Sequence, residues 1–368
     1  MKKIMIYLVC IFGLYAKQAY VLDQIPGSTL AQTLDPMTVQ RLGSKINDEN
    51  AIKYLRRAYL MSGDLKRGYE LEDFLYEKEE EKCKRLWRGE NLCGKTIYIF
   101  DNIGMGDVFC FMQYAKYMKA QGAKVILGTR GFLRPIMSSC PYIDEIIPRF
   151  GDVPECDVYV YMHKLPRMAY KAGFGIPCHE PGNYKPYLFA DKKLIQKWKG
   201  VLSQDKNFKV GICYDASVQK TISGKIVKND RSIPLHCFYE LSNLQGVSLY
   251  SLQRVNGTQQ LDSMPQDFKL YVFDENFDKE HGSFSDTAAV MKNLDLVITV
   301  DTSIAHLAGA LGVPVWMLLN YDSNWRWFQD RTDTQWYPTM RIFRQPERGD
   351  WDFVMSQVLQ AISKIIVK

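Results

Sequence analysis

The nine cysteines of this 368-residue chain contain no C-x-x-C pair, and most of them stand alone in apolar stretches. Structural zinc sites usually take their thiolates from closely spaced pairs, so the spacing argues against zinc. A disulfide framework is typical of small secreted domains, and this chain is long enough to bury a core without one. We therefore expect the cysteines to be buried thiols.

Two nucleotide-binding motifs and a nucleic-acid footprint are also missing. The glycine turn at Gly104 and Gly106 is not a G-x-G-x-x-G fingerprint, because Phe109 replaces the third glycine, and no Gly-Lys-Ser/Thr follows it. The net charge of +6 is a mild excess, and no basic run is interleaved with aromatic residues. These features argue against a nucleic-acid partner, although the mild positive charge suits an anionic ligand.

The apolar run from Ile4 to Ala16 is shorter than the ~20 residues that a spanning helix needs. Lys2 and Lys3 precede it, which is the layout of a secretory signal, although Lys17 makes the cleavage region poor. A cleaved signal, a short anchor and a packed N-terminal segment remain open. We expect a cytoplasmic protein, with peripheral membrane association or export as the alternatives.

The chain changes its pattern near residue 93. Residues 1–47 are the apolar segment and a polar linker, and residues 48–92 have a helical pattern broken at Ser62-Gly63-Asp64. The helix pair resembles one tetratricopeptide (TPR) unit. Because one unit cannot bury both of its faces, we expect residues 48–92 to cap another part of the protein.

From residue 93 onward, short apolar runs alternate with helical stretches, which predicts an α/β fold with parallel sheets and crossover helices. A stretch with prolines and a charged helix at 181–206 divides the pattern into two α/β halves, 93–190 and 191–368. The predicted strands are 95–100, 124–129, 144–149 and 157–162 in the first domain, and 209–214, 247–252, 269–274, 294–299 and 313–318 in the second.

The first candidate site is the turn with Gly104, Gly106 and Asp107, between a predicted strand and a long amphipathic helix. Glycines let the backbone turn tightly and approach a ligand. Such turns lie beyond the carboxyl ends of the strands, where open α/β sheets bind ligands. Asp107 fits two roles: an N-cap of the helix, or a general base.

The second candidate site is the stretch VITVDTSIAHLAGALGVPV at 297–315, which reads as strand, turn, helix and strand. Asp301 or Thr302 could cap the helix. Thr302, Ser303 and the first helical N–H groups also form a cradle for an anion, with His306 on the first turn.

Two cations, Lys228 and Arg231, precede another predicted helix in the stretch KNDRSIPL. Arg binds phosphate in a fork, so the pair suits a pyrophosphate beside that cradle. A solvated loop is the alternative reading.

Four segments together resemble glycosyltransferase family 9, the ADP-heptose:lipopolysaccharide heptosyltransferases, in the branch found behind tetratricopeptide repeats in bacterial proteins. This resemblance covers roughly residues 50–365. It implies a GT-B architecture, in which two Rossmann-like domains face each other across a cleft and the final helix, about 351–365, crosses back to the first domain. The segments are NIGMGDVFCFMQYA (102–115), NDRSIPL (229–235), DTAAVMKNLDLVITVDTSIAHLAGALGVPVWMLL (286–319) and NWRWFQDRTDTQWYPTMRIFRQPERGDW (324–351).

The resemblance also implies an activity: inverting transfer of a sugar from a nucleotide-diphosphate donor to a glycan or protein acceptor, without a cofactor or a metal. Gly104, Gly106 and Asp107 match the acceptor-side turn, whose Asp is the proposed base. Donor-side roles fall on Asp301, Thr302, Ser303, His306, Arg231 and Lys228. The D-x-D at Asp350-Trp351-Asp352 starts the last predicted helix, so we expect it to cap that helix.

Fold does not determine function, so a second hypothesis stays open. The chain could be a catalytically inactive binding protein with the same fold, which uses its helical cap to dock a partner. Asp107 together with the donor turn favours the enzyme. The weak basicity of a carboxylate at a helix N-terminus favours the alternative.

Overall fold

The computed structural model describes residues 49–177, 184–216, 219–220, 226–227 and 230–366. Their contacts divide them into two compact units. The smaller unit holds the residues up to Lys84 together with Asn324–Arg331, and the larger holds Arg85–Ser323 together with the chain from Thr332 onward. The apolar run at 4–16 lies outside the described residues.

The smaller unit is a helix pair, α5 (Glu49–Met61) and α6 (Leu65–Glu80), which confirms the predicted helices. Gly63 has φ +86° in the turn between them, a conformation that favours glycine. The segment Asn324–Arg331 belongs to this unit, because the Gln329 backbone N–H donates to the Met61 carbonyl at 3.1 Å. That this helix pair is a TPR unit remains a prediction.

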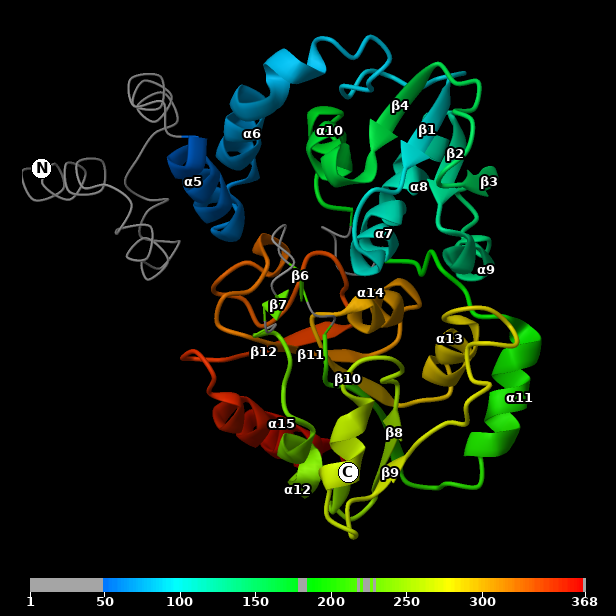
Figure 1. Cartoon of the computed structure of the whole chain (residues 1–368), viewed down its shortest axis with the longest axis vertical. Coiled ribbons are helices and arrows are strands. Elements are labelled where there is room, and N and C mark those ends of the chain that lie inside the picture. The colour runs from blue at the N-terminus through cyan, green and yellow to red at the C-terminus, as the bar shows by residue number, and fades with distance from the viewer. Residues whose placement is uncertain (1–48, 178–183, 217–218, 221–225, 228–229, 367–368) are drawn as a thin grey trace, which may run out of the picture. The chain divides into compact units, whose positions relative to one another are not determined.

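The first sheet of the larger unit has the order β3-β2-β1-β4, and its described strands are parallel. Its central strand β1 lies between β2 and β4, so the sheet is wound in both directions from β1 (Figure 1). The strands are β1 (Thr96–Phe100), β2 (Lys124–Thr129), β3 (Glu145–Pro148) and β4 (Val158–Tyr161). The helices and 3-10 turns are α7 (Met105–Phe111), η1 (Met112–Tyr114), α8 (Ala115–Ala120), η2 (Gly131–Leu133), α9 (Arg134–Met137), η3 (Met162–Lys164) and α10 (Leu165–Lys171).

The second sheet has the order β12-β11-β10-β5-β8-β9, again parallel along its described strands. Its strands are β5 (Phe208–Cys213), β8 (Val247–Ser251), β9 (Leu270–Tyr271), β10 (Leu296–Val300), β11 (Val315–Leu319) and β12 (Met340–Arg344). Its helices are α11 (Lys192–Leu202), α12 (Tyr239–Ser242), α13 (Ser285–Met291), α14 (Ser303–Ala310) and α15 (Trp351–Ile366), with 3-10 turns η4 (Leu235–Phe238) and η5 (Thr258–Ser263). The 3-10 turn η6 (Trp325–Trp327) belongs to the Asn324–Arg331 segment of the smaller unit.

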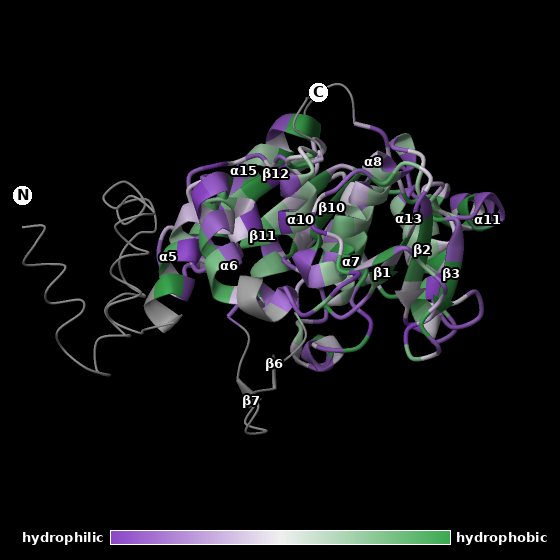
Figure 2. Cartoon of the chain, turned by 90° about the horizontal axis from the view of Figure 1, so that it is seen from above, coloured by the Kyte–Doolittle hydropathy of each residue, from purple (hydrophilic) through white to green (hydrophobic). Residues whose placement is uncertain are grey.

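The hydrophobic pattern explains these elements. Strands β10 and β11 are buried at every residue, as expected for parallel strands covered on both faces. Helix α11 instead buries only Leu194, Trp198 and Leu202, and it is largely hydrophilic in Figure 2. The alternation of buried strands and amphipathic helices confirms the predicted α/β fold with parallel sheets.

Three features differ from the expectation. Strand β12 was not predicted, because Arg341 and Arg344 interrupt its apolar residues and give the half-buried pattern of an edge strand. A short hairpin of β6 (Gln219–Lys220) and β7 (Ile226–Val227) was also missed. Helix α15 forms where predicted, but its buried side chains all lie in the core of the second sheet, whereas the resemblance implied a crossing to the first domain.

Of the described cysteines, Cys110, Cys140, Cys156 and Cys213 are buried, as expected, whereas Cys93 is exposed. Burial raises the pKa of Cys140 and of Cys213 to about 11. Across the described ranges, every helix is too short or too polar to cross a membrane.

Candidate functional site

The first predicted turn connects β1 to α7. Gly104 occupies the N-cap position in an extended conformation, and Asp107 lies on the first helical turn, half-buried. Asp107 is therefore not the N-cap, which corrects one of its two readings. Its Oδ2 lies 3.4 Å from the place that a Cβ on Gly104 would take, so the carboxylate folds over the turn.

A buried carboxylate that the sequence analysis missed holds this turn. Asp101 is fully buried and accepts hydrogen bonds from Thr129 Oγ1 at 2.8 Å and from the Arg130 guanidinium at 2.9 Å. Arg130 also donates to the Ile103 carbonyl. Since Asp101 follows β1 and Arg130 follows β2, the carboxyl ends of adjacent strands are tied together. An acid directly after an apolar strand was the signal available for it.

The second predicted turn connects β10 to α14. Thr302 is the N-cap of α14, and its Oγ1 accepts from the Ile304 backbone N–H at 3.3 Å. Thr302 therefore has the capping role that the sequence allowed. Asp301 is buried, and its Oδ1 lies 3.7 Å from Nε2 of His306. Ser303 begins the helix and is partly buried.

Arg231 reaches the same turn from the loop after β5. Its Nη1 donates to the Asp301 carbonyl at 3.1 Å and lies 3.9 Å from Oδ2 of Asp301. Its side chain remains 30% exposed. Lys228, the other predicted cation, lies outside the described residues.

The two turns meet. A Cβ on Gly106 would lie 2.7 Å from His306 Cδ2 and 3.4 Å from Ser303 Cα, and α7 and α14 pack against each other. Only glycine permits this approach, because the nearest atoms belong to a buried ring and to backbone. Gly106, Ser303 and His306 are thus brought together from opposite halves of the larger unit.

The position of both turns follows from the strand orders. β1 separates β2 from β4, and β10 and β5 are adjacent at the point where their sheet changes direction. Open α/β sheets bind ligands at such switch points, beyond the carboxyl ends of the strands. Asp107, Arg231 and Asp301 all come from segments that follow these central strands.

The loop after β5 is held by an amide. Oε1 of Gln253 accepts from the backbone N–H groups of Tyr214 and Asp215 at 3.1 and 2.9 Å, and its Nε2 donates to the Asp215 carbonyl. Asp215 in turn accepts from Ser232 Oγ at 2.7 Å, next to Arg231. Gln253 and Asp215 therefore fix the loop that carries Arg231, and neither was predicted.

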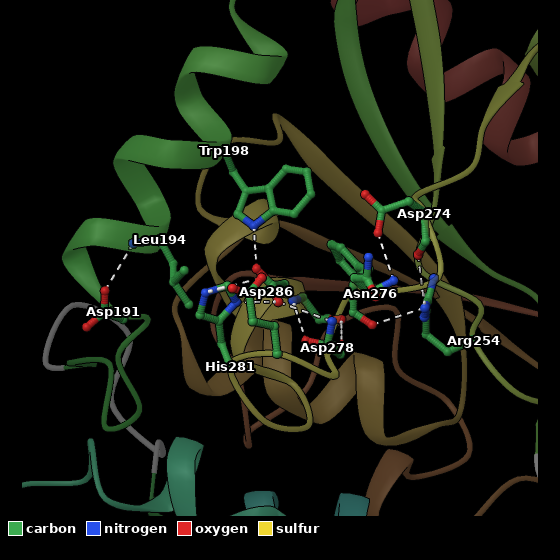
Figure 3. Close-up of polar contacts among 12 residues, drawn as sticks. Asp191, Leu194, Trp198, Arg254, Asp274, Asn276, Asp278, His281 and Asp286 are labelled. Atoms are coloured by element: carbon green, nitrogen blue, oxygen red, sulfur yellow. Dashed lines mark hydrogen bonds and ion pairs between the residues drawn. The ribbon is translucent and has the colours of Figure 1, made fainter.

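A second polar network stabilises the loop before α13 (Figure 3). Asp286 accepts from Trp198 Nε1 at 2.8 Å and from the Asp278 backbone N–H at 3.1 Å, and His281 Nδ1 lies 3.1 Å from it. Burial raises the pKa of Asp286, but the hydrogen bonds from Trp198 and His281 outweigh burial and hold the pKa below its usual value. The carboxylate is thus charged at neutral pH and holds α11 to α13.

This loop also touches the first half of the larger unit. Gly282 has φ +90°, and a Cβ there would lie 2.6 Å from Pro135 of α9. Phe284, at φ +67°, packs edge-to-face on Phe109 of α7 with ring centroids 5.2 Å apart. The halves therefore also meet at this loop, in addition to the Gly106 contact.

The D-x-D sequence caps a helix, as predicted, since the Phe353 backbone N–H donates to Asp350 Oδ1 at 2.9 Å at the start of α15. In the part of the chain that the structure describes, no three His, Cys, Asp or Glu side chains gather in a way that could hold a metal ion.

Residues 282–329 match the sequence model of glycosyltransferase family 9 (heptosyltransferase). This segment contains β10, the Asp301–His306 turn and α14. This segment of the chain is similar to glycosyltransferase family 9. The resemblance expected from the sequence is therefore confirmed, on the segment that carries the second candidate turn.

One relative is Protein FlbA of Caulobacter vibrioides, which is 23% identical over 296 residues. The match covers 75% of this chain and 48% of FlbA, so the chain spans about half the length of that relative.

Solved structures of family 9 proteins share the fold. A family 9 glycosyl transferase from Veillonella parvula gives a TM-score of 0.51 at 14% identity, over 76% of this chain and 99% of that one. The E. coli ADP-heptose lipopolysaccharide heptosyltransferase II gives 0.52 at 12% identity, over 74% and 98%. E. coli heptosyltransferase WaaC with ADP-2-deoxy-2-fluoro heptose gives 0.50 at 14% identity, over 73% and 99%. The larger unit thus has the heptosyltransferase (GT-B) fold.

Proposed function

We propose that the protein is an inverting glycosyltransferase of the heptosyltransferase kind, which transfers a sugar from a nucleotide-diphosphate donor to a hydroxyl of a glycan or protein. One observation carries the proposal: the Asp301–His306 turn, inside the family 9 segment, meets the Gly104–Asp107 turn of the other half. Donor-binding and acceptor-binding turns must adjoin if the two substrates are to react.

In this proposal the donor diphosphate lies at the N-terminus of α14. The helix begins at Ser303, whose backbone N–H is its first, and Arg231 adds a cation beside Asp301. A helix N-terminus and a guanidinium both stabilise the charge that develops on a leaving diphosphate, without needing a metal.

Asp107 would act as the general base on the acceptor side. It removes the proton from the acceptor hydroxyl, the oxygen attacks the anomeric carbon, and the bond between that carbon and the diphosphate oxygen breaks. Attack on the face opposite the leaving group inverts the anomeric centre.

Replacing the carboxylate with an amide tests this role. We expect Asp107→Asn to lower turnover by ~10²–10⁴, the usual contribution of a general base, and to leave donor affinity almost unchanged. The assay is release of ADP from ADP-heptose, with other nucleotide sugars tested in parallel. Asp352→Asn is the matched control, because Asp352 also lies on a first helical turn but away from both turns. Full turnover in a folded Asp107→Asn protein would eliminate the base assignment.

The second candidate is a binding protein without catalysis, and the position of Asp107 on the first turn of α7 favours it. The helix dipole stabilises the anion and so weakens it as a base. Saturable nucleotide-sugar binding with no turnover, for every donor and acceptor tested, would support this candidate over the enzyme.

A further inference from the structure

A chain of buried hydrogen bonds leads away from His306. The Nδ1 atom of His306 lies 3.0 Å from the hydroxyl of Tyr337, and both side chains are buried. The Tyr337 hydroxyl is also hydrogen-bonded to Tyr187 and to the Cys110 thiol. Tyr187 in turn donates to the Phe109 carbonyl at 2.8 Å. Phe109 belongs to α7, two residues after Asp107, so the chain joins the two halves.

The carbonyl at the end of this chain fixes the direction of every bond in it. A carbonyl oxygen can only accept, so the single proton of Tyr187 is used on Phe109. Tyr337 must then donate its own proton to Tyr187, so its oxygen is left to accept from the Cys110 thiol and from His306 Nδ1–H. Burial raises the pKa of Tyr337 well above its ordinary value, so the hydroxyl keeps that proton at neutral pH.

We propose that Tyr187 and Tyr337 are positioning residues that hold a proton on Nδ1 of His306 and orient its ring at the donor turn. This inference rests on the proposed function. It assigns the tautomer of His306 from a carbonyl that lies three hydrogen bonds away. That carbonyl belongs to α7. The proton on His306 Nδ1 is therefore held only while α7 packs against α14, as it does at Gly106.

The consequence lies at the other nitrogen. Nε2 is 3.7 Å from Asp301 Oδ1 and faces the turn that would meet the donor. With the proton on Nδ1, Nε2 can accept a hydrogen bond while the ring is neutral, whereas a second proton on Nε2 would make the ring a cation beside Asp301. The other tautomer would present a donor there, so loss of the chain changes the hydrogen bond that the turn can offer.

The test is the ¹⁵N spectrum of the histidine rings in protein labelled only at its five histidines, with His306 assigned from a His306→Gln variant. We expect Nδ1 of His306 to carry a proton in the native protein. Tyr187→Phe should lower the proton occupancy of Nδ1, although Tyr187 is one residue removed from His306. The reason is that the Tyr337 proton, which Tyr187 no longer accepts, can be donated to Nδ1, a stronger acceptor than the Cys110 sulfur. Tyr337→Phe should lower it too, because it removes the acceptor.

Tyr114→Phe is the control, since Tyr114 is also a buried tyrosine whose hydroxyl donates to a carbonyl, that of Gly175, at 3.1 Å. It should leave the His306 signals unchanged. A native neutral ring with its proton only on Nε2 would overturn the proposal. So would a folded Tyr187→Phe protein with an unchanged Nδ1 signal.

Kinetics add a second readout. If the protein is a glycosyltransferase, Tyr187→Phe should lower kcat/KM by roughly 2- to 12-fold, the range for loss of one hydrogen bond, and Tyr114→Phe should not. Absence of turnover in the native protein would count against the proposed function alone, because the ring spectrum reports the tautomer without any catalysis.

Discussion

Because of the contact at Gly106, we expect two glycine-to-alanine substitutions to have different effects on the free energy of unfolding. In an unobstructed helix, alanine stabilises the fold by up to ~1 kcal/mol relative to glycine. Gly200 in α11 is exposed and would place its Cβ in open space, so Gly200→Ala should raise the free energy of unfolding by about that amount. Gly106 is also helical, but its Cβ would lie 2.7 Å from a ring atom of His306.

Overpacking of this kind typically costs ~1–3 kcal/mol, which cancels or exceeds the helix propensity gain. His306 cannot move aside cheaply, because it is buried and bonded to Tyr337. We therefore expect Gly106→Ala to be between neutral and ~2 kcal/mol less stable than the native protein. Its donor affinity should also fall, because relief of the clash moves α7 away from α14.

Urea unfolding of the two variants beside the native protein measures the stabilities, and calorimetry with ADP measures the affinity. Suppose that Gly106→Ala gains as much stability as Gly200→Ala and binds ADP like the native protein. The close approach of the two turns would then be absent in solution, and the reasoning about the site would be refuted.

Two further predictions concern the buried carboxylates. The pKa of Asp286 lies below its usual value, so its stabilisation is complete above about pH 4 and is lost as the pH falls through the lowered folded value. Asp286→Asn should therefore flatten the acid limb of the plot of stability against pH, and an equally steep limb in the variant would contradict this. Asp101→Ala removes the partner of Arg130 and should destabilise the fold by about 3 kcal/mol in urea unfolding, the lower end for a buried pair, since Arg130 is 19% exposed. A loss below about 1 kcal/mol would show that water replaces the carboxylate, as at surface pairs.

Much of the fold could be predicted because its signals are local. The strands β10 and β11 are continuous apolar runs, and Thr302 is a typical N-cap at the start of α14. Strand β12 could not be recognised in the same way, because Arg341 and Arg344 break its apolar run.

The site was predictable only in part, since local patterns do not report which segments meet. Glycine at 106 signalled a close approach, but only the fold shows that the approaching groups are Ser303 and His306. Asp101, Gln253 and Tyr337 act through partners that are distant in the sequence. The apolar strand that precedes Asp101 was a signal for that residue, but nothing in the immediate neighbourhoods of Gln253 and Tyr337 distinguishes them from ordinary polar or core residues.

The most direct test of the central claim is calorimetric titration of ADP, and in parallel of adenosine, into the native protein and its Arg231→Ala variant. If the diphosphate rests on the turn at Asp301, ADP should bind at one saturable site. Arg231→Ala should then weaken the binding of ADP by roughly 1.5–3 kcal/mol, as for loss of a hydrogen bond to a charged group. The binding of adenosine should change little. Equal loss for both ligands would remove Arg231 from the phosphate site. Absence of binding by ADP and by the other nucleoside diphosphates would contradict the proposal that this turn is a donor site.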